Sequence, residues 1–343
     1  MRRLISHTWL LLLLLLLPLA GLAQSRDSFF ADLNEFLDMR AAKNYAKWDT
    51  TYIDRYPYKW DARLFLNTEG LHLNTDGAAD TKLSTGMSNR VGVSLSYRGL
   101  GLSYTRAIGR KLNFGFGFST YGTHLGFEYA LRASSRLSGA VQLPGEERRK
   151  ADAGDLTLLA SSLNVFYSFN PRFSYAAAMK QTRIQRRSAG SVIAAVSWTV
   201  WDILRAGPDI ISKQTSIQTF LEVTNLMYNR YSLGVGYGYN LVAGDDAHWL
   251  FHASLIPMWT FYDSTHLRQE GETVKYRRPI GRYGITGTAR AGIYYRWGTR
   301  WSVGLSSIIN QMSSSTSLRT QTEGYYHFEA QDWQARLSVG FRF

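Results

Sequence analysis

Regularly alternating residues dominate the chain from Trp60 to Phe343. In residues 232–241 and 333–343, for example, large apolar or aromatic side chains recur at every second position. The positions between them hold mostly glycine, serine, asparagine and arginine. Alternation with period two predicts β-strands that have one apolar and one polar face. Runs of about nine to eleven residues are long enough to cross a bilayer as tilted strands.

A soluble β-sandwich would show the same alternation, with its apolar faces packed together. Three features favour a membrane barrel: the strands are long, the apolar face is rich in aromatic residues, and glycine dominates the polar face. The 21 tyrosines and 10 tryptophans suit the aromatic girdles at two membrane interfaces. We therefore expect an all-β, antiparallel transmembrane β-barrel.

The first residues have the pattern of a secretory signal peptide. Arg2 and Arg3 precede a leucine-rich run, and Gly21-Leu22-Ala23 offers the small residues of a cleavage site. The apolar stretch is short and polar sequence follows it, so we expect residues 1–23 to be removed and not to span a membrane.

Two further regions are expected. Residues 24–59 are predicted to form a periplasmic N-terminal segment or a plug for the barrel. Apolar residues at helical spacing predict a short helix over residues 28–43. Residues 60–343 are predicted to form the barrel, located in the outer membrane with the N-terminus in the periplasm.

Connection lengths predict the number of strands, because such barrels have short turns at one end and long loops at the other. This alternation holds throughout if residues 213–224 form a strand, which gives about fourteen strands; twelve is the alternative. Short turns are expected at Arg98-Gly99, Tyr121-Gly122, Asn170-Pro171 and Gly298-Thr299.

The last strand has the pattern that outer-membrane barrels present to their assembly machinery. Apolar residues recur at alternate positions up to the final aromatic residue: Leu337, Val339, Phe341 and Phe343.

Several stretches resemble one family of barrel proteins. They are residues 49–53, 119–122, 164–170, 173–178 and 185–191, with Asp49, Tyr52, Gln181, Arg187, Ser188 and Gly190 as motif positions. The family is a Bacteroidota-type outer-membrane β-barrel family of unknown function. The resemblance implies an outer-membrane location and implies no activity.

The formal net charge is +13. In a secreted chain, this charge points to lipopolysaccharide phosphates and small anionic solutes as partners, and not to nucleic acid. Basic outer loops near residues 148–150 and 268–278 fit the same partner. Strand phase places several charged residues in the lumen: Arg63, Arg98, Glu128, Arg132, Arg290, Arg296, Arg336 and Arg342. They would favour anions in an open pore; alternatively, they pair with acids and fill it.

The best catalytic candidates are His252 and Ser254, which share one face of a strand. An imidazole in this position could take the serine proton. Their phase, however, points them into the lumen, and no orienting acid or amide is evident at a matched position. We therefore expect no enzyme, no cofactor and no metal site.

The sequence thus predicts a non-enzymatic outer-membrane barrel, either a narrow anion-favouring pore or an envelope scaffold. The partners expected are outer-membrane lipid, lipopolysaccharide and the barrel-assembly machinery. Two alternatives stay open: a transporter plugged by residues 24–59, and an envelope-lipid hydrolase that uses His252 and Ser254.

Overall fold

The computed structural model describes residues 26–77, 80–108, 113–142, 149–205, 223–269, 272–277, 284–319 and 323–343. The chain divides into two compact units, and the boundary lies between Lys47 and Trp48. In the first unit, α2 (Arg26–Tyr45) covers the predicted helix. The predicted signal peptide lies outside the described residues. No helix in the described part is long and apolar enough to cross a membrane.

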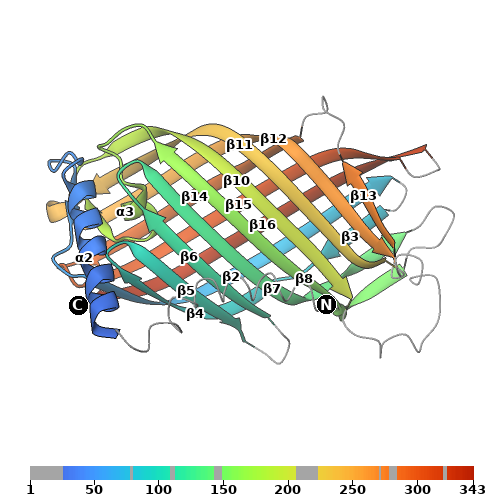
Figure 1. Cartoon of the computed structure of the whole chain (residues 1–343), viewed down its shortest axis with the longest axis horizontal. Coiled ribbons are helices and arrows are strands. Elements are labelled where there is room, and N and C mark those ends of the chain that lie inside the picture. Colours follow the sequence, from blue (N-terminus) through green and yellow to red (C-terminus); the bar gives the residue numbers. More distant parts are fainter. Residues whose placement is uncertain are drawn as a thin grey trace. The chain divides into compact units, whose positions relative to one another are not determined.

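Twelve antiparallel strands form the closed wall of the second unit (Figure 1). They are β2 (Trp60–Gly77), β4 (Ser88–Tyr97), β5 (Leu100–Ala107), β6 (Asn113–Tyr121), β7 (Leu125–Gln142), β8 (Arg149–Ser168), β10 (Ala189–Arg205), β11 (Val223–Ala243), β12 (Trp249–Gln269), β14 (Gly284–Trp297), β15 (Trp301–Arg319) and β16 (Glu323–Arg342). Each strand pairs with its neighbour along the chain, and β16 pairs with β2 to close the wall. The predicted all-β antiparallel barrel is confirmed.

The wall has the lower of the two predicted strand counts. A count of fourteen required residues 213–224 to form a wall strand, but β10 pairs directly with β11, from Ala189–Asn240 to Leu204–Asn225. Most of that segment lies outside the described residues. Two extra strands, β3 (Asp80–Ser84) and β13 (Glu272–Arg277), bring the whole sheet to fourteen.

The wall turns its apolar side chains outward. In β11, Leu233, Val235 and Tyr237 are 43–58% exposed, whereas Ser232 and Asn240 are 1% and 0% exposed. A wall with this distribution has its apolar face where lipid would lie and its polar face in the interior. The residues of the predicted assembly signal belong to the outward face: Leu337, Val339 and Phe343 are exposed, and Phe341 stacks on Phe343.

The connection between β8 and β10 is not the predicted short turn at Asn170-Pro171. Residues 169–188, here called the insert, contain α3 (Tyr175–Met179) and β9 (Arg183–Gln185). Strand β9 pairs with β1 (Ile53–Arg55), which precedes the first wall strand. The insert enters the barrel at the end where Trp60 and Phe343 meet, here called the terminal end (Figure 1).

The insert packs against inward-facing wall residues. Phe173 and Ile193 are fully buried in one cluster with Phe166, Ile256 and Met258. Burial of such large apolar groups stabilises the insert in the lumen. The lumen at the terminal end is therefore occupied by the chain's own residues.

A second apolar cluster fills the opposite end of the barrel. Along β2, pairing changes from β4 to β3, and β3 also pairs with β7. The distal cluster consists of Leu71, Leu73, Leu83, Leu137, Leu156, Leu158, Ala160, Trp201, Tyr228, Met312 and Ala330. Apolar clusters thus lie in the described interior toward both ends of the barrel.

Leu137 and Leu95 test this arrangement, because they are 0% and 46% exposed. We expect Leu137→Ala to lower the free energy of unfolding by about 2–5 kcal/mol, because it leaves a cavity in a packed interior. Leu95→Ala should have a smaller effect, since lipid or detergent tails can fill the space. Guanidinium unfolding in lipid vesicles measures both. Equal losses would show that the distal cluster is not packed.

Candidate functional site in the barrel interior

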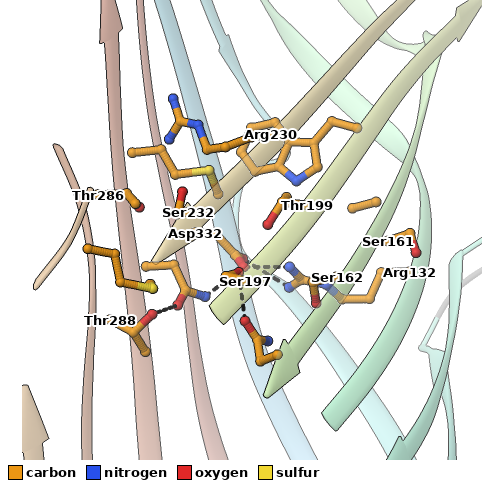
Figure 2. Close-up of a pocket in the computed structure, with 16 residues that line it drawn as sticks. Arg132, Ser161, Ser162, Ser197, Thr199, Arg230, Ser232, Thr286, Thr288 and Asp332 are labelled. Carbon is orange, nitrogen blue, oxygen red and sulfur yellow. Dashed lines mark hydrogen bonds and ion pairs between the residues drawn. The ribbon is translucent and has the colours of Figure 1, made fainter. Parts of the chain in front are cut away.

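A small polar cavity lies between the two apolar clusters (Figure 2). Its volume is about 50 Å³. It borders Ala160, Trp201 and Met312 of the distal cluster and Met258 of the cluster that packs around Phe173 of the insert. The polar lining consists of Arg132, Ser161, Ser162, Asn164, Ser197, Thr199, Arg230, Ser232, Thr286, Thr288, Asn310 and Asp332. A cavity of this size holds a few water molecules and no larger solute.

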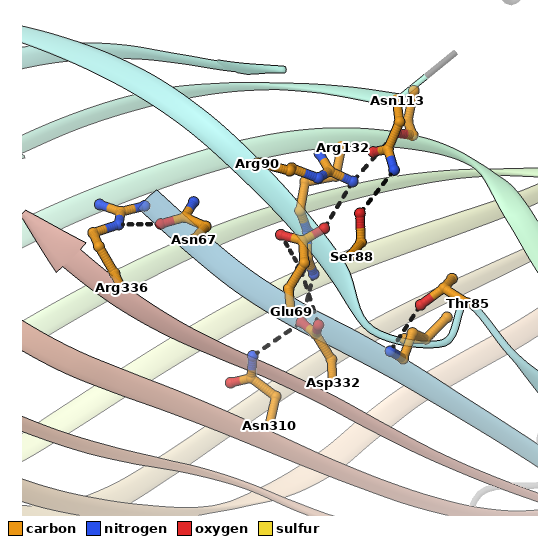
Figure 3. Close-up of polar contacts among 12 residues, drawn as sticks. Asn67, Glu69, Thr85, Ser88, Arg90, Asn113, Arg132, Asn310, Asp332 and Arg336 are labelled. Carbon is orange, nitrogen blue, oxygen red and sulfur yellow. Dashed lines mark hydrogen bonds and ion pairs between the residues drawn. The ribbon is translucent and has the colours of Figure 1, made fainter. Parts of the chain in front are cut away.

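Arginines beside this cavity are matched by carboxylates (Figure 3). Arg90 Nη2 lies 2.7 Å from Glu69 Oε1, and Arg132 Nη1 donates to Asp332 Oδ1 at 2.9 Å. Asn310 also donates to Asp332, at 3.3 Å. On the other side of the cavity, the ion pair of Arg230 with Asp263 is longer, at 3.8 Å. The positive charge of the lumen is therefore largely balanced inside the wall.

A second set of charged residues holds the insert. Arg290 Nη1 and Nη2 donate to the two carboxylate oxygens of Glu128 at 3.0 and 2.8 Å, and Nη1 contacts Met179 of the insert. Tyr121 also donates to Glu128. Bidentate pairing of this kind fixes both partners. The pair therefore fixes the position of Arg290, which contacts the insert at Met179.

Arg63 and Arg342 hold the other side of the insert. Both pair with Asp61, at 2.7 and 3.1 Å. Arg63 also donates to the Gln181 side chain at 2.6 Å, and Arg342 donates to the Gln181 carbonyl at 2.8 Å. Gln181 itself has a φ of 52°. The two arginines thus stabilise a bend in the insert that a non-glycine residue rarely adopts.

Lys180, next in the insert, lies near several arginines. Desolvation lowers the pKa of its ammonium to about 8; Arg336, Arg63 and Arg290 contribute and Glu128 opposes them. Below this pH, Lys180 is charged although burial and the nearby arginines disfavour its charged form.

Two of the predicted lumen residues, Arg98 and Arg296, lie near the terminal end of the barrel. Arg98 is in the two-residue turn between β4 and β5, where it and Gly99 have φ values of 50° and 87°. Strand phase does not apply in a turn, so the reason for assigning Arg98 to the lumen fails. Arg296 lies at the terminal end, where its guanidinium donates to the carbonyls of Gly298 and Asp246. Arg336 is inside the wall and donates to Asn67 at 2.9 Å.

Glu128, the one acid among the predicted lumen residues, has further inward acids beside it in the described barrel. Asp61, Glu69 and Asp332 are 5–7% exposed in the interior. Asp61 and Glu69 share the phase of Arg63 on β2, so the same period-two rule would have identified them. Arg90 and Arg230, at 1% and 2% exposure, were also missed.

The motif positions of the family resemblance gather on the insert and its surroundings. Tyr52 lies between the guanidinium groups of Arg172 and Arg187, at 4.9 and 5.8 Å from its ring centre. Asp49 accepts a hydrogen bond from Arg172 at 2.9 Å. Two more motif residues act where the insert rejoins the wall: Ser188 accepts from the Val242 N–H at 2.9 Å, and Gly190 lies against the Tyr237 ring.

His252 and Ser254 point into the interior, at 3% and 6% exposure. His252 Nε2 lies 3.1 Å from Ser254 Oγ, and His252 Nδ1 lies 2.8 Å from Asn240 Oδ1. The sequence did not reveal this amide. Asn240 lies directly opposite His252 in the β11–β12 register. That register depends on the turn at Gly244–His248, where Asp246 and Ala247 have positive φ values.

A family model described as "Domain of unknown function (DUF4421)" matches residues 47–343. No curated protein is detectably similar in sequence. Of the basic residues in the predicted basic loops, Arg148 and Arg278 lie outside the described residues, whereas the others lie in strands β8, β12 and β13.

Several solved β-barrels are similar to this chain at low sequence identity and low TM-score. The outer membrane protease OmpT from Escherichia coli is 9% identical, with 84% of this chain and 97% of that chain covered and a TM-score of 0.35. The translocator domain of the autotransporter NalP from Neisseria meningitidis is 10% identical, with 94% and 99% covered and a TM-score of 0.36. The Pseudomonas putida toluene transporter TodX is 9% identical, with 84% and 90% covered and a TM-score of 0.29.

The Glu128–Arg290 pair predicts a measurable coupling. Glu128→Gln should lower the free energy of unfolding by about 3–5 kcal/mol, because it leaves a buried guanidinium without its counter-charge. Glu128→Leu combined with Arg290→Met should cost less than the sum of the two single changes. As the control, Asp54→Asn breaks the exposed Asp54–Arg186 pair and should cost about 0–1 kcal/mol. Additive losses in the double variant would contradict the coupling.

Proposed function

We propose that this chain, which belongs to the family of unknown function whose model matches residues 47–343, is an outer-membrane β-barrel with a closed lumen. In this proposal it serves as an envelope scaffold. The observation that carries the proposal is the filled interior: the insert occupies the terminal end and the distal cluster occupies the other. An open pore needs a continuous water-filled path. The cavity between the clusters, at about 50 Å³, does not supply one.

The membrane location rests on the wall itself. Large apolar residues face outward along the strands, and the closed ring of strands leaves its backbone groups paired, as a bilayer requires. Short turns share the terminal end with Trp60 and Phe343, so this end is assigned to the periplasm. Outer-membrane lipid and lipopolysaccharide then cover the outside, and the last strand engages the assembly machinery.

The lumenal arginines favour the scaffold over an anion-favouring pore. Arg63, Arg90, Arg132 and Arg290 each have a carboxylate partner within 3 Å. A paired guanidinium leaves little net positive potential to select a small anion.

Planar-bilayer conductance of the refolded protein tests this proposal. We expect no conductance from the wild type. We also expect none from a variant in which residues 172–187 are replaced by a short Gly-Ser linker, because the distal cluster still closes the barrel of that variant. A control variant carries the same linker in place of residues 244–248, a turn at the terminal end, and shows whether a changed turn alone alters the conductance. Steady conductance by the wild type would refute the scaffold and support a pore.

A plugged transporter is the second candidate, and one observation favours it. Strand β9 pairs with β1 and with no wall strand of the described barrel, so the insert could leave as a unit. The plug would then include residues 169–188 and not only the predicted residues 24–59. Conductance that appears only in the linker variant would identify this function.

Lys180 makes plug release dependent on pH. The seated insert lowers the Lys180 pKa to about 8, whereas a released lysine titrates near 10.5. Binding of the insert in the lumen therefore becomes more favourable as pH rises from about 8 to 10.5. Below pH 8, Lys180 is charged in both states, and the full cost of burying its charge opposes binding. If the plug moves, opening events should be more frequent at pH 7 than at pH 9.5, and Lys180→Met should remove the difference. An equal pH effect in Lys180→Met would exclude Lys180 as its origin.

A further inference from the structure

Three buried side chains between the insert and the wall form one hydrogen-bonded chain. Asn240, His252 and Ser254 are 0%, 3% and 6% exposed. Asn240 and His252 face each other across the β11–β12 hairpin, and Ser254 follows two residues along β12 on the same face. Two wall strands, which are rigid elements, thus hold all three groups.

The insert determines which way the Asn240 amide faces. Gln185 Nε2 donates to the carbonyls of Arg172 and Arg187, at 2.7 and 2.9 Å, so Gln185 Oε1 is left to accept. Asn240 Nδ2 donates to this Oε1 at 3.1 Å and to the Ser174 carbonyl at 3.0 Å. With its NH₂ group committed to these acceptors, Asn240 presents Oδ1 to His252.

This orientation determines the tautomer of His252. Because Asn240 Oδ1 can only accept, the proton lies on His252 Nδ1, and Nε2 keeps its lone pair. Ser254 Oγ–H, at 3.1 Å, then donates to Nε2. A hydroxyl, a neutral imidazole base and an orienting carbonyl oxygen in this order are the arrangement that activates a serine.

We propose that Ser254 is an activated nucleophile that can cleave a small carboxylic ester, with His252 as its base and Asn240 as a positioning residue. Ser254 Oγ would bond to the ester carbonyl carbon while His252 Nε2 takes the serine proton. The carbon–oxygen bond to the alcohol then breaks, and the alcohol leaves with that proton. Water, deprotonated by His252, releases the carboxylic acid and restores Ser254.

Arg290 supplies a donor close to the reacting atoms. It is the cross-strand partner of Ser254, and among the described residues its Nε–H has no hydrogen-bond acceptor. Both Nη atoms are committed to Glu128, which fixes the guanidinium in place. A preorganised donor of this kind can stabilise the negative charge that develops on an ester oxygen.

The insert covers this site. Phe173 and Tyr175 lie with ring centres 6.2 and 5.8 Å from that of His252. The ester must therefore reach Ser254 from the terminal end past these two rings while Gln185 keeps its hydrogen bond to Asn240. The inward position of Ser254 excludes direct attack on bilayer lipid. This inference goes beyond the scaffold proposal and does not depend on it, because a closed barrel can still admit a small ester locally.

Labelling by a fluorophosphonate tests the proposal on the full chain in detergent micelles. The reagent bonds to an activated serine with loss of fluoride, and peptide mass spectrometry locates it. We expect label on Ser254 in the wild type, faster label in Tyr175→Ala, which opens space beside the site, and none in Ser254→Ala. His252→Gln should slow labelling about 100-fold. Ser232→Ala, which changes another buried lumenal serine, should have no effect.

The test of Asn240 needs a measurement that separates its positioning role from a loss of folding. Asn240→Leu should lose labelling. Asn240→Asp in its protonated form donates to the Ser174 carbonyl or Gln185 Oε1 in place of the amide and still accepts from His252 Nδ1–H, so it should restore labelling. Folding of every variant is checked by heat-dependent migration in gels. Hydrolysis of p-nitrophenyl butyrate should follow the same order.

Two results would overturn the proposal. One is the absence of label on Ser254 in both the wild type and Tyr175→Ala. The other is label whose rate is unchanged in His252→Gln. Either result would leave the Asn240–His252–Ser254 chain as an anchor for the insert, and neither would affect the conductance test of the closed barrel.

Discussion

Closure of the wall on itself is the constraint on which the rest of the structure depends. With β16 paired to β2, the strands leave no free edge at this junction, and each strand must turn one face out and one face in. The outward face is apolar, so the polar and charged side chains are confined to the interior. There they have little water, and each needs a partner within the barrel.

The interior meets this need by pairing charges and by folding its own chain inward. Arg63 pairs with a carboxylate on its own strand, whereas Arg132 and Arg290 reach carboxylates on other strands. The insert satisfies others through its backbone: Arg342 and Asn240 bind carbonyls of Gln181 and Ser174. Polar groups that would line water in a channel instead hold a packed segment, and the proposal of a closed barrel rests on this packing.

The same contacts connect the insert to the chemistry at Ser254. Gln185 orients Asn240, and Asn240 orients His252. If the insert moves, it uncovers Ser254 and also releases the amide that aligns the base. The hydrogen bonds that hold the insert in the lumen are therefore the same ones that orient Asn240 and His252.

Much of the wall could be predicted from the sequence, because period two is a local property. It placed Leu255 outward and His252 inward, and applied evenly it would also have found Asp61 and Glu69. The insert could not be predicted in this way: Phe173 and Ala176–Ala178 form a short apolar run whose burial depends on residues such as Ile193 and Ile256, distant in the chain. Asn240 was missed for a related reason, since its place opposite His252 follows from the hairpin register and not from spacing.

The central claim, a sealed interior, can be tested directly because the chain contains no cysteine. Ser232→Cys places a single thiol in the cavity wall, at a position that is 1% exposed, and Met87→Cys places one at a position that is 69% exposed. A water-soluble maleimide applied to the folded protein in vesicles should modify residue 87 within minutes and residue 232 only after unfolding. Rapid modification of the cysteine at 232 in the folded protein would contradict the account and show a water-filled path into the lumen.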